Sequence, residues 1–103
     1  MKADEQMRLL DNLQSLLEKQ IEMARRSNLR RVEALAEQAD SVVEKIVKTK
    51  AFEQPRLDGR RELLTKLYKK LELILAAGKD SVGKQLRQVG NVRKTLQAYC
   101  NTG

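Results

Sequence analysis

The chain has 103 residues and a formal net charge of +7 at pH 7, which suits a single domain with a modest core. Aromatic residues make up 3% of it, and histidine and tryptophan are absent, so base stacking and histidine-based catalysis have little support. We expect no signal peptide, and no apolar run approaches the roughly 20 residues of a membrane span. These features predict one cytoplasmic domain over residues 1–103.

The first half of the chain carries apolar residues at steps of three or four, which is the spacing of one helix face. Helices are predicted at about residues 3–26 and 28–53. In the first of them, Leu9, Leu16 and Met23 widen the apolar stripe, as expected for a helix that touches two neighbours.

Ser27 and Asn28 lie between these two helices, and either side chain can cap a new helix. The basic pair Arg25 and Arg26 suits the carboxyl end of the first helix, where the dipole is negative. We favour a turn or a sharp kink at this point. Because the apolar seam can also be followed through Asn28, a single long helix is the alternative.

Pro55 marks the clearest break, since it removes a backbone donor and disfavours helix at the residue before it. A third helix is predicted over about 58–100, weakened by Gly78 and Gly83 in its interior. The apolar steps continue across these glycines, so we expect one long helix; the alternative is a split into a fourth helix near 78–83. The predicted fold is an all-α antiparallel bundle, or hairpin, of three helices.

The third predicted helix also carries the net charge. Residues 55–103 hold eleven basic and four acidic side chains, whereas the basic and acidic residues before them balance. If the first two helices are separate, the far end of a 40-residue third helix overhangs them, and its apolar stripe lacks a partner. The alternative is that this stripe packs on the first helix as core.

Three stretches resemble the FlgN-type family of flagellar export chaperones. They are the leucine-rich opening Leu9–Glu18, the central pattern Ala24–Glu37 with its small-polar pair before a leucine, and the basic closing stretch Lys84–Tyr99, which ends in an aromatic. The resemblance implies a cytoplasmic all-helical chaperone. Such a protein would bind the amphipathic C-terminal helices of hook–filament junction subunits until the export apparatus takes them.

The predicted client site is the closing stripe, used in the helix-in-groove mode. Four cations would form a basic rim that steers an acidic client: Lys84, Arg87, Arg93 and Lys94. The apolar contacts would come from Val82, Leu86, Val89, Val92, Leu96 and Tyr99.

Other functional classes have weaker support. We expect no enzyme, cofactor or metal site, since no nucleophile–base pair or phosphate loop occurs, and Glu18–Glu22 and Glu33–Glu37 are typical of solvated helix faces. A coiled-coil adaptor or self-associating bundle, such as a homodimer, is the strongest alternative. A polyanion-binding helical protein is the third hypothesis, because basic charge is concentrated in one segment.

Overall fold

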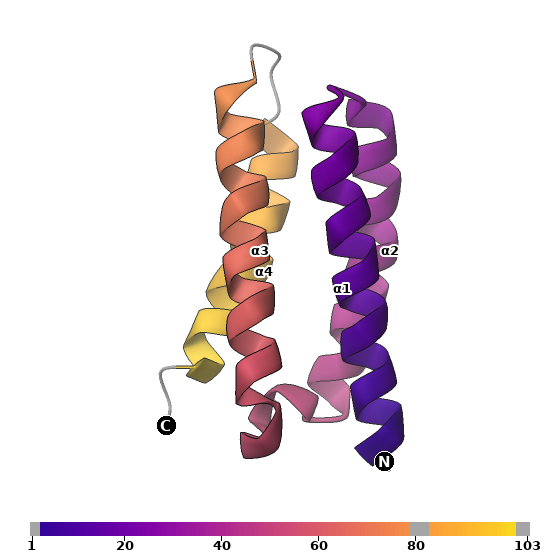
Figure 1. The fold of residues 1–103 in the computed structure, drawn as a ribbon, viewed down its shortest axis with the longest axis vertical. Helices are drawn as coiled ribbons and strands as arrows, with labels where there is room; N and C mark the ends of the chain where they lie inside the picture. Colours follow the sequence, from indigo (N-terminus) through magenta and orange to yellow (C-terminus); the bar gives the residue numbers. More distant parts are fainter. Residues whose placement is uncertain (1–2, 79–82, 101–103) are drawn as a thin grey trace.

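The computed structural model describes residues 3–78 and 83–100, and this part of the chain forms four α-helices (Figure 1). The helices are α1 (Ala3–Arg25), α2 (Leu29–Lys48), α3 (Asp58–Ala77) and α4 (Gly83–Cys100). Two single-turn 3-10 helices, η1 (Ala51–Glu53) and η2 (Pro55–Leu57), connect α2 to α3. The predicted all-α class is therefore confirmed.

The helices run alternately up and down the long axis of a body that measures 41 × 23 × 18 Å (Figure 1). Helix α1 packs against α2 and α3, and α4 packs against the same two helices from the opposite corner. This is the up-down-up-down arrangement of an antiparallel bundle. In it, the α1–α2 and α3–α4 pairs form opposite faces.

The core is a cluster of aliphatic side chains to which every helix contributes. The periodic stripes seen in the sequence supply it, since residues three and four apart share one face of a helix. Its most deeply buried members include Leu10, Leu13, Leu17, Val32, Ile46, Leu64, Tyr68, Leu71 and Leu96.

The turn predicted between α1 and α2 is present, and its geometry explains why the chain reverses there. Ser27 has a left-handed backbone with φ of 59°. Its amide donates to the Ala24 carbonyl at 3.0 Å, and the Asn28 amide donates to the Met23 carbonyl at 2.9 Å, which is the Schellman pattern of a helix end. The Asn28 side chain then accepts from the Arg31 amide at 3.3 Å and caps α2.

Helix α2 ends at Lys48, earlier than the predicted boundary at residue 53. Thr49 is the C-cap residue of α2, and its hydroxyl donates a hydrogen bond to the Ile46 carbonyl in the last turn of the helix at 3.1 Å. Lys50 then adopts a left-handed backbone with φ of 59°, a conformation that cannot continue an α-helix. The predicted boundary at residue 53 is wrong, because it rests on the apolar spacing, and that spacing continues through the turn.

The prediction of one long third helix is also wrong, and the alternative split near 78–83 is what the structure has. Gly78 follows α3 with an extended backbone, φ −68° and ψ 149°, and glycine is a poor helix former. Helix α4 begins at Gly83 and runs antiparallel to α3 (Figure 1). The reversal brings the apolar stripe of α4 into the core, so this stripe does not overhang.

Candidate functional site

The apolar stripe of α4 lies largely inside the bundle. Val89, Val92 and Leu96 are exposed by only 2%, 9% and 0%, and Leu86 is half-buried against the same core. The prediction that this stripe is an open surface is therefore wrong for Val89, Val92 and Leu96, because α4 folds back onto α2 and α3. Val82 and the Tyr99 side chain lie outside the described part of the chain.

Polar contacts hold α4 along both flanks of this stripe. On the α2 side, the Gln88 amide donates to the Asp40 carboxylate, and the Lys84 ammonium lies 3.5 Å from the Glu33 carboxylate. On the α3 side, Arg93 Nε donates to Glu72 Oε1 at 2.8 Å. The predicted basic rim is thus divided between two faces, with Lys84 on the α2 side.

A shallow hollow of about 330 Å³ lies between α3 and α4 and brings the other three predicted cations together. Leu86 is the apolar group in its lining. Arg93 is fixed in place, since it pairs with Glu72 and also donates to the Gln97 side chain at 2.5 Å. The full lining is Glu72, Leu86, Arg87, Gly90, Asn91, Arg93 and Lys94.

Gly90 allows α3 and α4 to approach closely beside this hollow. A Cβ at this position would lie 3.3 Å from Glu72 Oε1, which is tighter than an ordinary van der Waals contact. The absence of a side chain therefore leaves room for the Glu72 carboxylate to reach Arg93. Gly90 therefore serves a contact between two helices.

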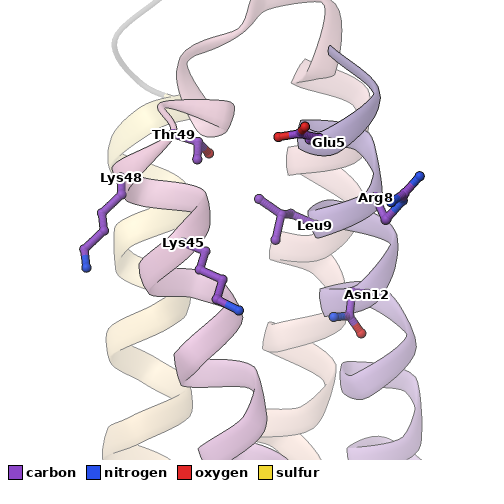
Figure 2. A pocket seen from close by; sticks show the side chains of 7 residues that line it. All are labelled: Glu5, Arg8, Leu9, Asn12, Lys45, Lys48 and Thr49. Carbon is purple, nitrogen blue, oxygen red and sulfur yellow. The ribbon is translucent and has the colours of Figure 1, made fainter. Parts of the chain in front are cut away.

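A second depression, which we call the α1–α2 groove, has a volume of about 390 Å³ and lies on the opposite face. Figure 2 shows Leu9 and Lys45 pointing into the space between the two helices, with Arg8 and Lys48 at its outer edges. Leu9 is the apolar side chain of the groove. The lining residues are Glu5, Arg8, Leu9, Asn12, Lys45, Lys48 and Thr49.

Sequence reasoning missed this groove, although part of its signal was present. Leu9, Leu16 and Met23 were assigned to a flank of α1 that touches a neighbour, and Leu16 is indeed buried. At the Leu9 end, however, the groove is lined on the α2 side by Lys45, Lys48 and the following residue Thr49. The Lys45 side chain points toward this space, but its ammonium stays in water, and no apolar side chain of α2 lines the groove beside Leu9.

Hydrogen bonds fix the helix ends below the α1–α2 groove. The buried Gln6 side chain donates to the Thr49 carbonyl at 3.1 Å, and Arg56 donates to the Gln6 side-chain oxygen at 3.0 Å. These contacts tie the start of α1 to the end of α2 and to the α2–α3 connection. The groove is therefore preformed, and its end is held by Gln6 and Arg56, which do not line it, through the lining residue Thr49.

The buried titratable group Tyr68 does not belong to either depression. Burial raises the pKa of its hydroxyl well above the ordinary value, and the nearby Asp40 charge adds to the shift. Its oxygen has no hydrogen-bond partner among the described residues. A neutral phenol enclosed in the core is typical of a structural residue and lacks the access that a catalytic acid needs.

Within residues 3–78 and 83–100, no cluster of three or more potential metal ligands is present. None of the helices described is both long enough and apolar enough to cross a membrane. No protein-family model, curated protein or solved structure matches this chain.

Proposed function

We propose that this protein is a cytoplasmic export chaperone of the FlgN type, which binds the amphipathic C-terminal helix of a hook–filament junction subunit. The observation that carries the proposal is the α3–α4 hollow, where Leu86 lies among Arg87, Arg93 and Lys94. An apolar contact bordered by cations is what an acidic amphipathic helix needs. The resemblance of three stretches to that family supplies the identity of the client.

The ion pairs of the hollow indicate which cations serve the client. Arg93 is already paired with Glu72, so its charge is largely neutralised within the protein. Arg87 and Lys94 form no ion pair among the described residues. In this proposal, Arg87 and Lys94 receive the client carboxylates, Leu86 contacts its apolar face, and the role of the protein is binding, without catalysis.

Calorimetric titration with a synthetic peptide tests this proposal, the peptide being the C-terminal helix of the junction subunit encoded by the same genome. Arg87→Glu should weaken binding by about tenfold, because a favourable charge contact becomes a repulsive one. Lys84→Glu is the matched control, since it makes the same charge change on the other flank of α4. Equal losses in both variants would contradict the proposal, as would a peptide that does not bind the unaltered protein.

One observation favours the self-associating bundle as a second candidate. Leu73 on the outer side of α3 is 72% exposed, and Leu63 on the same helix is 39% exposed. Large apolar side chains at the surface are common singly, and Leu73 is the most exposed of those in the described part of the chain, which makes it the place to test for an interface. Sedimentation equilibrium over a wide concentration range would detect a dimer, and Leu73→Glu should abolish it.

A further inference from the structure

We propose that the α1–α2 groove is a docking site for an acidic amphipathic helix of a partner protein. This site is additional to the α3–α4 hollow. The two depressions lie on opposite faces of the bundle, since α1 and α4 occupy opposite corners (Figure 1). One helix cannot occupy both, so a partner in the groove leaves the hollow accessible.

The shape of the groove suits a helix. It runs between two antiparallel helices, so a third helix can lie along it with its side chains in the space between them. Its lining on α1 extends from Glu5 to Asn12, which corresponds to about 12 Å at 1.5 Å per residue. A partner helix would therefore be held over about two turns, with one or two apolar side chains against Leu9.

Charge defines the chemistry of the partner. Arg8 comes from α1, and Lys45 and Lys48 come from α2; Lys45 points into the groove, whereas Arg8 and Lys48 point outward from its rims (Figure 2). Glu5 on α1 is the acidic side chain of the lining and points into the groove, so the lining carries three cations and one anion. None of these three cations forms an ion pair among the described residues. Glu5 offsets Arg8 on the α1 side, so the excess of positive charge lies on the α2 side, where Lys45 and Lys48 would meet the carboxylates on one flank of an acidic helix.

The groove is also prepared for binding before the partner arrives. The hydrogen bonds of Gln6 with Thr49 and Arg56 join the α1 wall to the α2 wall at one end of the groove. Leu16, one heptad further along α1, is buried, so the opening is confined to the Leu9 end. A site with fixed walls loses little conformational entropy when a helix enters it.

The test uses the full chain and a fluorescently labelled amphipathic peptide of about three heptads, with leucine at a and d and glutamate at e and g. Fluorescence anisotropy gives the affinity, and amide chemical shifts of the isotopically labelled protein locate the peptide. We expect the shift changes to gather in Glu5–Asn12 and Lys45–Thr49. The double variant Lys45→Glu/Lys48→Glu should weaken binding by about tenfold or more.

Two controls separate docking from general attraction to a basic protein. The variant Lys66→Glu/Lys69→Glu makes the same charge change at the same spacing on exposed positions of α3, and its affinity should change by less than about twofold. A peptide with lysine at e and g should regain binding to Lys45→Glu/Lys48→Glu. Equal losses in the two double variants, or shift changes at the α3–α4 hollow, would overturn the proposal.

The occupant is tested separately from the location. If the protein alone forms a dimer that Leu9→Gln abolishes, a second copy of the chain covers the groove and the partner-helix proposal fails. If duplex DNA produces the same localised shifts and the acidic peptide does not, the groove binds a polyanion and the proposal likewise fails.

Discussion

Replacing Leu96 by alanine tests whether α4 is docked in the core as the structure has it. Leu96 is 0% exposed and belongs to the central cluster. Truncating a fully buried leucine removes its transfer free energy and leaves a cavity, which costs about 2.7–5 kcal/mol in the free energy of unfolding. For a domain whose total stability is about 5–15 kcal/mol, this is a large part of the whole.

Urea denaturation followed by circular dichroism at the helix band measures this loss, and thermal melting checks it at about 4–8 °C per kcal/mol for a domain of this size. Leu73→Ala is the matched control, because it makes the same chemical change on a side chain that is 72% exposed. Its cost should stay within about 0.5 kcal/mol. If Leu96→Ala lowered the free energy of unfolding no more than Leu73→Ala does, α4 would not be packed against the core in solution. The apolar stripe of α4 would then be an open surface, as predicted from the sequence.

Two further predictions concern single positions. Ser27→Gly should stabilise the protein by about 1 kcal/mol, because a left-handed backbone costs serine that much and glycine nothing; urea denaturation measures it, and a loss of stability would show that the turn differs from the Schellman geometry. Tyr68 has a raised pKa in the folded state, so its contribution is complete below the unfolded value of 10.0 and is lost as pH rises above it. Tyr68→Phe should therefore reduce the decline in stability above that pH. It should also stabilise the protein at neutral pH, because it removes an unpartnered buried hydroxyl. The first expectation would be refuted if the free energy of unfolding fell equally steeply with pH in both proteins across the alkaline range.

The sequence predicted helices well where periodicity and capping residues agree. Arg25, Arg26, Ser27 and Asn28 together mark the α1–α2 turn, and the chain turns there. At Gly78 the two signals conflict. The apolar steps continue across the glycine, and periodicity alone cannot distinguish one straight helix from two that reverse direction, since both bury the same stripe.

The candidate sites were harder to predict, because their side chains come from different helices. Arg87, Arg93 and Lys94 meet at one hollow while Lys84 lies elsewhere, and this division depends on which flank of α4 faces α3. Predicting the α1–α2 groove would require the knowledge that Lys45 lies beside Leu9, which is 36 positions away in the sequence. Periodicity within one helix gives its buried face, but it does not give the neighbour on each side.

The contact of Gln6 with Thr49 and Arg56 has a consequence for the order of folding. The α1–α2 and α3–α4 pairs are hairpins of helices adjacent in the chain, so their contacts form after short loop closures. The Gln6 hydrogen bonds join residues 43 and 50 positions apart, and they require α1, α2 and the α2–α3 connection to be in place together. The Gln6–Thr49 bond can therefore form with the α1–α2 hairpin itself, and the Arg56–Gln6 bond then fixes the start of the connection that leads to α3. The direction in which α3 leaves the first hairpin is thus set before the α3–α4 hairpin docks.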